Sequence, residues 1–530
     1  MRICALRSAF SVPLAACALA IAGAGTASAG SVGAAPIKLP GAGASRAAAS
    51  DWIIGARAGA RSDQLAARFG AQPITGLPAF TVARAKATEM AAALKRERLL
   101  AWAEPNIRAK RKSAYEGQLD RWARVAVVPA DFAWPAPGSV AVAVLDDRVD
   151  GSVSDLSQQT RWLNSTPVTE AHGTMVASTI SAVVGRGPIV GVFPGTPILS
   201  YGLTSFSCAN VAAGIDAAVK AGARIINMSL GTEIGCFTMN AAIQRAYSKD
   251  VLSVAAAGNE FTEGNPTEYP AAFPHVVSVA ATDSRGRVSE FSTANAAVDV
   301  AAPGVGVPVD VPLKFDNEDG NPTDGATTAN GTSFSSPITA GAAAWIASVR
   351  PDLKPGQIAD LLRKGAKDVA PKGYDRNTGF GLVNIPASLA LPTPMLDPQE
   401  PNDSIPLVDG TALGSKAPLL WTGGVAASLA AKIDQLKDPL DIYRIRIPAR
   451  STAKISLTPK FGGVDLTVYT STAKSASGSR YRVAYSKKSG KLVDRVAVKN
   501  SSTNTKNFYV VVSDHDSKLL NAEYTLRISR

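Results

Sequence analysis

The 530-residue chain has few of the side chains from which many functional sites are built. It contains only three histidines and four cysteines. A histidine base, if the protein uses one, must therefore be His172, His275 or His515. Apart from one apolar stretch near the N-terminus, no segment is apolar for the roughly 20 residues that a membrane-spanning helix needs. This excludes a transmembrane helix in the rest of the chain.

The N-terminus has the features of a secretory signal peptide. Arg2 and Arg7 precede an apolar stretch at about residues 10–22, and Ala27-Ser28-Ala29 is typical of a cleavage site. We expect residues 1–29 to be removed on export and the protein to be extracellular.

Cys17 offers an alternative way of anchoring the chain. Residues 14–17 read L-A-A-C, which resembles the lipobox of bacterial lipoproteins and would leave a lipid on Cys17. The apolar stretch continues past this cysteine, however, whereas the apolar core of a lipoprotein signal ends there. Lipid anchoring is therefore the less favoured alternative.

The charge of the chain is positive overall but changes sign along it. The net charge of +12 is made up of +2 in residues 1–29, +9 in 30–112, −8 in 113–397 and +9 in 398–530. Without the first 112 residues only +1 remains, so the composition does not indicate nucleic-acid binding. The signs favour docking of the basic N-terminal region on the acidic middle region. They leave open whether the C-terminal region docks there too, binds an anionic cell envelope, or carries only scattered surface charge.

Ser333 lies where a helix is predicted to begin. Residues 330–337 read N-G-T-S-F-S-S-P, and the small residues after them can continue as a buried helix. Backbone N–H groups at a helix start are unpaired and the helix dipole is positive there, so an oxyanion formed beside Ser333 would be stabilised. An ordinary N-cap serine is the alternative. It is the better interpretation unless a base, an orienting acid and a second oxyanion donor occur elsewhere.

His172 is the histidine best placed to be the base. Val176 and Ile180 follow it at helical spacing, so its ring is predicted to project from the first turn of a helix. His275 opens an apolar, strand-like run, for which a structural role is expected. His515 lies in a polar segment and is interpreted as a surface residue, with a metal site as a remote alternative.

Two further polar residues follow apolar, strand-like runs. Asp146 comes directly after residues 140–145, which read V-A-V-A-V-L, and Asn259 ends residues 251–259, which read V-L-S-V-A-A-A-G-N. Functional groups collect beyond the carboxyl ends of strands in a parallel sheet. Asp146 is therefore a candidate orienting acid and Asn259 a candidate amide donor, with turn-forming roles as the alternatives.

Together these residues resemble the subtilisin-like serine peptidases, the subtilases of peptidase family S8, whose catalytic residues run in the order Asp, His, Ser. The resemblance implies that Ser333 is the nucleophile, that His172 is the general base and that Asp146 orients the imidazole. It also implies that Asn259 and the Ser333 N–H bind the oxyanion. The implied fold is α/β, with a mostly parallel central sheet flanked by helices.

Two other segments extend this resemblance. Residues 225–231 read I-I-N-M-S-L-G, similar to the family's strand that binds the substrate backbone and lines its first specificity pocket. This implies substrate-binding roles for Ser229, Leu230 and Gly231. Asp155 with the following leucine stands at the family's spacing from the catalytic aspartate.

Three positions depart from the family's pattern. Arg148, Ala171 and Ser178 each stand where the family usually has glycine. None of them removes a catalytic atom. Arg148 adds bulk and charge close to Asp146, so it could alter the hydrogen bonds of the aspartate or narrow the cleft and leave the enzyme weak or inactive.

The regions around the catalytic segment resemble the parts of a secreted peptidase precursor. We predict a signal peptide at residues 1–29, a propeptide at 30–112, a peptidase domain at 113–392, a proline-rich linker at 393–406 and a C-terminal β-sandwich at 407–530. A separate binding module is the alternative for the second region, but its place directly before the peptidase favours a propeptide.

The folded part of the propeptide is predicted at about residues 51–110. Its pattern predicts strands at 52–56, at 79–83 and near Trp102, and helices at about 62–69 and 88–100. This order resembles the ferredoxin-like α+β propeptides that chaperone and inhibit subtilases. The resemblance implies that the segment is an intramolecular inhibitor.

The C-terminal region alternates as strands do and has no strong helical run. Four segments look like the bacterial pre-peptidase C-terminal domain, namely E-P-N-D-S from Glu400, D-P-L-D-I-Y from Asp438, F-Y-V-V-V from Phe508 and Y-T-L-R-I-S from Tyr524. An all-β sandwich is therefore expected.

Cys208 and Cys236 are the cysteines that remain after the signal peptide is removed. An even pair in an exported chain suggests a disulfide, with two buried free thiols as the alternative. In the family's arrangement both cysteines border the substrate cleft, so a bridge between them would brace it.

Glu268 carries the hypothesis on substrate preference. Glu268-Tyr269-Pro270 resembles the base of the family's first specificity pocket, where an acidic residue favours a basic residue before the cut bond. R-A-K-R-K at residues 108–112 lies where the propeptide should end. We therefore expect the precursor to process itself after a basic residue.

The predicted protein is thus a monomeric, secreted serine endopeptidase that acts on polypeptides, is inhibited by its own propeptide and needs no cofactor. A catalytically silent relative that binds peptides or envelope components is the alternative. A sedolisin-like peptidase is a third candidate, against which H-G-T at His172 argues. Structural calcium stays open, because residues 185–191 lack the carboxylates of a calcium loop and the C-terminal aspartates are weak candidates.

Overall fold

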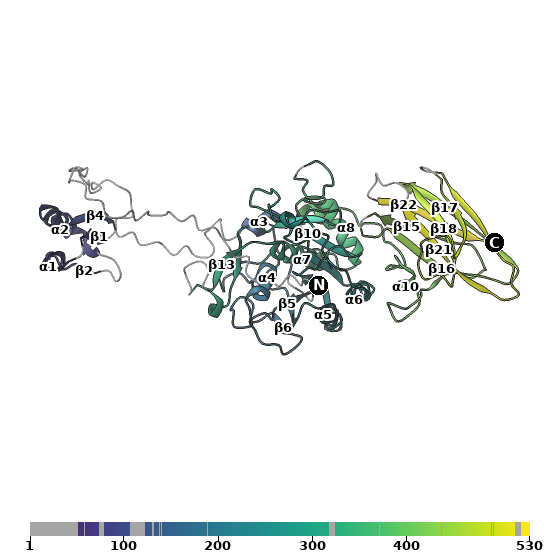
Figure 1. Ribbon diagram of the computed structural model, residues 1–530, viewed down its shortest axis with the longest axis horizontal. Helices are drawn as coiled ribbons and strands as arrows, with labels where there is room; N and C mark the ends of the chain where they lie inside the picture. Colours follow the sequence, from purple (N-terminus) through teal and green to yellow (C-terminus); the bar gives the residue numbers. More distant parts are fainter. Residues whose placement is uncertain are drawn as a thin grey trace. The chain divides into compact units, whose positions relative to one another are not determined.

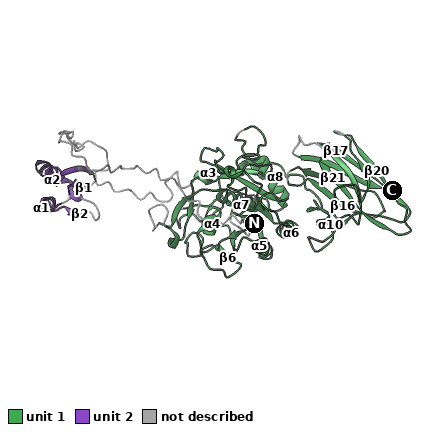
Figure 2. Cartoon of the chain, in the orientation of Figure 1, with its two compact units in different colours: residues 1–6, 113–530 green, residues 7–112 purple. Residues whose placement is uncertain are grey.

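A computed structural model describes residues 51–57, 59–73, 79–105, 122–129, 132–136, 138, 140–187, 189–316, 324–369, 371–435, 437–488, 490, 492–514 and 521–530. The chain divides into two units, one containing Ser113–Arg530 and one of Arg7–Lys112 (Figure 2). The predictions on the signal peptide, Cys17, the basic segment at 108–112 and His515 fall outside the described residues.

The N-terminal unit is a four-stranded antiparallel sheet combined with two helices. Its elements are β1 (Asp51–Ala56), α1 (Ala60–Arg68), β2 (Gln72–Pro73), β3 (Ala79–Ala83), α2 (Arg84–Arg96) and β4 (Leu100–Pro105). The strand order is β2-β3-β1-β4, with every neighbouring pair antiparallel. Ile54, Leu65, Met90 and Leu94 join strand and helices in one buried cluster. This βαββαβ arrangement is that of the predicted ferredoxin-like fold.

The second helix of this unit begins and ends earlier than predicted. The pattern predicted a helix at 88–100, and the structure has α2 at Arg84–Arg96. Arg98 has a left-handed φ of 57°, and the Leu99 N–H donates to the Leu94 carbonyl at 2.8 Å, which closes the helix end. The leucines that continue the helical pattern therefore lead into β4. Strand β2 was not predicted.

The larger unit contains a seven-stranded parallel sheet in the order β11-β10-β9-β8-β5-β7-β6. Its strands are β5 (Ala141–Asp146), β6 (Thr160–Trp162), β7 (Ile198–Gly202), β8 (Ala223–Met228), β9 (Leu252–Ala256), β10 (Val276–Thr282) and β11 (Val300–Pro303). Every residue of β5, β9, β10 and β11 is buried. Strands covered on both faces read as mostly apolar runs, and such runs indicated β5, β9 and β10 in the sequence, whereas β11 was not predicted.

Helices cover both faces of this sheet (Figure 1). They are α3 (Trp122–Val127), α4 (His172–Ser181), α5 (Cys208–Lys220), α6 (Phe237–Tyr247), α7 (Thr332–Val349), α8 (Pro355–Gly365) and α9 (Ile385–Ala390). Val142 and Val144 of β5 pack in the cluster that includes α4 and α7, whereas Ala143 and Leu145 pack with α5 and α6. Alternate residues of the strand thus serve opposite faces. The predicted fold class is confirmed.

The C-terminal region consists of two further sheets, β14-β16-β21-β18-β19 and β15-β22-β17-β20. The strands are β14 (Leu419–Trp421), β15 (Ala427–Asp434), β16 (Leu440–Ile447), β17 (Ser451–Phe461), β18 (Val464–Thr470), β19 (Arg482–Ser486), β20 (Asp494–Asn500), β21 (Lys506–Asp514) and β22 (Asn521–Ser529). A buried cluster unites residues of both sheets, among them Tyr443 and Tyr524. This confirms the predicted all-β region. Within the part of the chain that the structure describes, no helix is both long and apolar enough to cross a membrane.

Candidate active site

Ser333 is the second residue of α7, which follows the short strand β13 (Ala326–Ala329). Gly331 precedes the helix with a φ of 142°, a conformation that favours glycine. Ser333 is 8% exposed. It therefore has the surroundings predicted for it, because the unpaired N–H groups and the positive end of the dipole of α7 lie next to its side chain.

The carbonyl of Ser333 is held by a neighbouring strand rather than by its own helix. In a regular helix it would accept from the N–H of residue 337, but Pro337 has none. Instead the Ser229 hydroxyl, just beyond β8, donates to it at 2.7 Å. Asn227 Nδ2 donates to the Ser229 hydroxyl at 3.0 Å, and the Ser336 hydroxyl donates to Asn227 Oδ1 at 2.7 Å. This buried chain of hydrogen bonds fixes the start of α7 against β8.

Asp146 and His172 meet where β5 ends and α4 begins. Asp146 is the last residue of β5 and is 1% exposed, and His172 is the first residue of α4. Asp146 Oδ1 lies 2.8 Å from His172 Nδ1 and accepts from the Asp147 N–H, also at 2.8 Å. Gly173 permits this approach, because a Cβ there would lie 1.9 Å from the Asp147 carbonyl oxygen. The fold thus brings two of the predicted residues into contact.

The surroundings of His172 favour its protonated form. Partial burial lowers its pKa, but the charge of Asp146, the hydrogen bond to it and the charges of Asp147 and Glu170 raise the pKa above its usual value. The ring can accept a proton only above this raised pKa, because a general base must be neutral. The ring of Phe334 lies 5.7 Å from that of His172, between centroids, so the start of α7 adjoins the imidazole.

Asn259 lies beyond β9 and faces the start of α7. Its Oδ1 accepts from the Thr332 N–H at 2.9 Å and from the Thr332 hydroxyl at 3.0 Å. A backbone N–H can donate only to the oxygen of the amide, so Nδ2 is turned away from Thr332. A Cβ placed on Gly331 would lie 3.7 Å from Asn259 Nδ2 and 3.8 Å from Ser333 Cβ. The amide donor and the serine side chain therefore flank the same glycine.

Glu268 lies beside the segment expected to bind substrate. Tyr269 and Thr232 exchange two backbone hydrogen bonds of 2.8 Å, which aligns Glu268 with Gly231. A Cβ on Gly231 would lie 2.6 Å from Glu268 Oε2, and one on Gly258 would lie 2.7 Å from Glu268 Cγ. The side chain of Glu268 thus lies between the backbones at Gly231 and Gly258. Any other residue at these two positions would collide with it.

The carboxyl of Glu268 is hard to ionise in this position. It is 5% exposed. Burial is the main reason that its pKa is raised to about 7, and the charges of Glu260 and Glu233 add to the effect. A cation bound beside the carboxyl would favour its charged form. Of the other predicted substrate-binding residues, Ser229 is 3% exposed and supports Ser333, and Leu230 packs in the cluster with α5 and α6.

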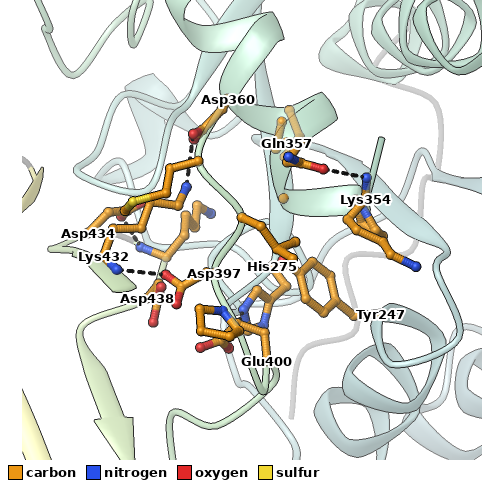
Figure 3. Close-up of a pocket in the computed structure, with 18 of the residues that line it drawn as sticks. Tyr247, His275, Lys354, Gln357, Asp360, Asp397, Glu400, Lys432, Asp434 and Asp438 are labelled. Carbon is orange, nitrogen blue, oxygen red and sulfur yellow. Dashed lines mark hydrogen bonds and ion pairs between the residues drawn. The ribbon is translucent and has the colours of Figure 1, made fainter. Parts of the chain in front are cut away.

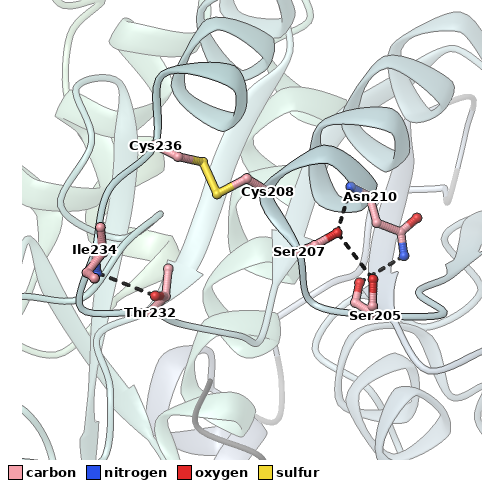
Figure 4. The surroundings of a disulfide bond; sticks show 7 residues. All are labelled: Ser205, Ser207, Cys208, Asn210, Thr232, Ile234 and Cys236. Carbon is pink, nitrogen blue, oxygen red and sulfur yellow. Dashed lines mark hydrogen bonds between the residues drawn. A yellow bond between two sulfur atoms is a disulfide. The ribbon is translucent and has the colours of Figure 1, made fainter. Parts of the chain in front are cut away.

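Cys208 and Cys236 form a disulfide (Figure 4). Cys208 is the first residue of α5, and Cys236 caps the start of α6. The bond therefore ties together the beginnings of two helices that cover one face of the sheet. Cys236 follows Gly231 by five residues, so the bridge also restrains the chain just after the candidate substrate-binding segment.

Three residues depart from the family's pattern, namely Arg148, Ala171 and Ser178. Among the described residues, no hydrogen bond or ring contact joins their side chains to the side chain of a catalytic residue. Arg148 Nη1 donates to the Thr166 carbonyl at 2.7 Å, and its guanidinium lies 5.1 Å from the centre of the Trp162 ring. Ser178 donates to the Met175 carbonyl at 2.7 Å, within its own helix. Ala171 caps the start of α4. The side chain of Arg148 is thus engaged elsewhere than at Asp146.

A second group of titratable residues lies between the peptidase region and the C-terminal sandwich (Figure 3). It surrounds a cavity of about 240 Å³. His275 and Tyr247 of the peptidase region pack ring to ring, with 3.9 Å between centroids. Asp397 and Glu400 precede the sandwich, and Asp438 follows β15. None of the residues that line this cavity belongs to the group around Ser333.

His275 is buried among carboxylates, which the sequence did not indicate. Its Nδ1 lies 2.7 Å from Gln244 Oε1, and its Nε2 lies 3.2 Å from Glu400 Oε2. Asp403 Oδ2 lies 3.6 Å from Nδ1. Burial lowers the pKa of His275 to about 3, so the ring is neutral and can act as a structural hydrogen-bonding group or as a metal ligand.

The carboxylates of this junction fit a hard divalent cation. Asp397, Glu400 and Asp438 offer oxygens within 4.8 Å of one another, as do His275, Glu400 and Asp403 with their ligand atoms. Glu400, Asp403 and Asp438 each have a buried oxygen without a hydrogen-bond partner among the described residues. Burial, followed by the charge of Asp441, raises the pKa of Asp397 to about 9 and that of Asp403 to about 8. A site rich in carboxylate oxygens is the kind that calcium prefers.

Sequence reasoning missed this junction. Glu400 and Asp438 were recognised only as landmarks of a domain, and His275 only as the start of a strand. The one available signal was the closeness of Glu400, Asn402 and Asp403 in the chain, which by itself is too common to indicate a site.

Comparison with known proteins places the catalytic segment in a family. Residues 138–381 match the subtilase family, peptidase S8. The chain is 35% identical to fervidolysin of Fervidobacterium pennivorans over 289 residues, which are 48% of this chain and 41% of fervidolysin. It is 32% identical to subtilisin DY of Bacillus licheniformis over 255 residues, which are 47% of this chain and 87% of that protein. The chain therefore belongs to the subtilase family and is a serine-type endopeptidase by that membership.

A similarity to a solved structure extends further along the chain but is weak. The crystal structure of fervidolysin matches 88% of this chain and 92% of that one, at 18% sequence identity and a TM-score of 0.48.

Proposed function

We propose that the protein is a secreted endopeptidase in which Ser333, His172 and Asp146 cleave peptide bonds through an acyl-enzyme. The observation that supports this best is the 2.8 Å contact between Asp146 and His172 beside the start of α7. The orientation of the Asn259 amide toward the same helix start adds a second, independent support.

In the proposed reaction, Ser333 Oγ attacks the scissile carbonyl and its proton passes to His172. The carbonyl oxygen becomes an oxyanion, which the Ser333 N–H and Asn259 Nδ2 bind. As the C–N bond breaks, His172 gives the proton to the leaving amine. A water molecule then attacks the acyl-enzyme with His172 again as base, which releases the new carboxylate and restores Ser333. Asp146 holds the imidazole in the tautomer that these steps need and stabilises its charged form.

We propose a basic residue before the cut bond as the substrate preference. The buried Glu268 lies between Gly231 and Gly258. The positive charge of a lysine or arginine side chain would stabilise its ionised carboxylate. The precursor carries such residues at 108–112, so the same preference would let it process itself there. Residues 30–112 would then act as the enzyme's own inhibitor, with their excess of positive charge facing an acidic peptidase region.

We also propose a structural calcium ion at the junction between the peptidase region and the sandwich. Asp397, Glu400 and Asp438 would hold it, and Asp403 and His275 lie close enough to take part. The ion would neutralise carboxylates that are otherwise buried together. No step of the peptide cleavage depends on it.

Casein hydrolysis by the purified, mature protein tests the proposed activity. We expect hydrolysis by the wild type, its loss on treatment with a serine-directed phosphonate, and its absence in Ser333→Ala. A folded wild type that binds casein without cutting it would instead identify a silent relative. N-terminal sequencing of the wild type and of the Ser333→Ala precursor tests self-processing. A cut far from residues 108–112, or one that persists in the variant, would contradict it.

A further inference from the structure

A lysine of the C-terminal sandwich contacts the turn that carries Glu268. Lys437 belongs to the turn between β15 and β16 and is 2% exposed. Its Nζ donates to the Ala271 carbonyl and lies 3.5 Å from Asp299 Oδ2. A buried ammonium is unfavourable unless it is paired, so these two partners in the peptidase region define where Lys437 sits.

Lys437 is part of a row of four residues with alternating charge, two from the sandwich and two from the peptidase region. Asp299 is 0% exposed, and Arg363 of α8 donates to its Oδ1 at 2.9 Å. Arg363 also donates to Asp434 Oδ2 at 2.8 Å. Asp434 and Lys437 come from the same turn of the sandwich, and Arg363 and Asp299 from the peptidase region. These pairs of opposite charge favour the observed placement of the turn.

Ala271, which Lys437 contacts, belongs to the same turn as Glu268. The Ala272 N–H donates to the Glu268 carbonyl at 2.8 Å, and the Phe273 N–H donates to the Pro270 carbonyl at 2.9 Å. Residues 268–273 therefore form one closed turn. On one side this turn pairs with Thr232 next to the candidate substrate-binding segment, and on the other side it is held by Lys437.

We propose that Lys437 is a positioning residue for Glu268, and that the sandwich is thereby part of the substrate-binding apparatus. By holding the Ala271 carbonyl, Lys437 keeps the turn, and with it the Glu268 carboxylate, at the place where a basic side chain would bind. Small displacements of a group that contacts substrate are costly, so loss of this support reduces the preference for a basic residue. The effect on specificity rests on the proposed role of Glu268.

The experiment compares Lys437→Met with Lys432→Met in the full-length mature protein at saturating calcium. Lys432 lies in β15 and forms another ion pair between the two regions, with its Nζ 2.9 Å from Asp360 Oδ2 (Figure 3). The control thus removes the same kind of side chain from the same junction without touching the Glu268 turn. Lys437→Gln replaces the first variant if Lys437→Met does not fold.

Two readouts are measured on each variant. The first is KM and kcat for a pair of peptides that differ only in having arginine or leucine before the cut bond. The second is hydrogen exchange of the Ala272 and Phe273 amides. For Lys437→Met we expect KM to rise about tenfold for the arginine peptide alone, kcat to change less than about twofold, and exchange to quicken about tenfold, all absent in Lys432→Met.

The outcomes separate this inference from the proposed function. Equal behaviour of the two variants, or faster exchange without a change in the ratio of the two KM values, would overturn the role of Lys437. A wild type that cuts neither peptide, or both equally well, would count against the proposed function or the role of Glu268. In that case exchange alone decides whether Lys437 holds the turn, and unchanged exchange in Lys437→Met would refute it.

Discussion

Two histidines of this protein lie beside carboxylates, and their surroundings shift their pKa values in opposite directions. His172 contacts one hydrogen-bonded carboxylate, Asp146, and its side chain is 22% exposed. His275 is 6% exposed, with Glu400 and Asp403 at 3.2 and 3.6 Å. The pKa of His172 is raised, whereas burial lowers that of His275 to about 3. A histidine beside acids is therefore no sign of catalysis by itself, because burial lowers the pKa of both rings and only at His172 do the neighbouring carboxylates outweigh it.

The neighbours of each ring sharpen this contrast. At His172 the ring and a backbone N–H both bind Oδ1 of the one contacting carboxylate, and only its Oδ2 lacks a hydrogen-bond partner among the described residues. At His275 several carboxylate oxygens lack partners among the described residues. The first arrangement suits proton transfer to and from a passing substrate, and the second suits a bound cation.

The largest effect is expected from removing the oxyanion donor beside Ser333. Asn259→Ala should lower kcat by about 10² to 10³ with little change in KM, a magnitude known from subtilisin, a member of this family. Asn259→Asp is the matched control, because it keeps the oxygen that accepts from Thr332 and loses only the amide N–H₂. Both variants should be impaired, and only the first should also lose stability. A kcat within a few-fold of the wild type in either variant would show that Asn259 is not the donor.

At the junction, the expected effect is on stability rather than on cleavage. With calcium at about 100 times its Kd, the folded state should gain about 2.7 kcal/mol, and a chelator should remove this gain. Thermal unfolding with and without calcium measures it. In Glu400→Gln the dependence on calcium should largely vanish, whereas Glu290→Gln, which replaces an exposed acid, should behave as the wild type. Identical unfolding of the wild type in calcium and in chelator would contradict the proposed calcium site.

Glu268→Gln should cost about tenfold in the preference for arginine over leucine before the cut bond. In the wild type this preference should grow as the pH rises through about 7, because Glu268 loses its proton there and the charged carboxylate attracts arginine. The ratio of kcat/KM for the two peptides between pH 6 and 8 measures the effect and cancels the titration of His172. A glutamine variant with an unchanged ratio and the same pH profile would contradict the assignment.

The smallest effect is expected from Arg148→Gly, which restores the family's usual residue. Activity on casein should change less than about twofold, because the Arg148 side chain is held by Thr166 and Trp162. A tenfold gain would show instead that the arginine hinders the catalytic aspartate.

Local patterns in the sequence were sufficient to place Ser333 at a helix start, His172 in the first turn of a helix and Asp146 at a strand end. Asp146 and Asn259 each follow an unbroken apolar strand, and the glycines next to His172 and Ser333 mark close backbone approaches. The orientation of the Asn259 amide and the support of Ser333 by Ser229 could not be predicted, because they depend on residues that are far apart in the chain.

The junction escaped prediction for a related physical reason. Lys437, His275 and Glu400 are each ordinary in their own segments, and only the docking of two regions makes them a site. The end of α2 was placed wrongly because the helical pattern of leucines continues through residues whose backbone turns into β4. Patterns of side chains predict elements well, but they carry no information on where two elements meet.

The most direct test of the account is to locate the adduct of a serine-directed phosphonate by mass spectrometry of the mature protein. We expect one adduct per chain, on Ser333, and its formation should be suppressed in His172→Ala, where no base activates the serine. An adduct on another residue, or casein hydrolysis that continues undiminished in Ser333→Ala, would contradict the central claim.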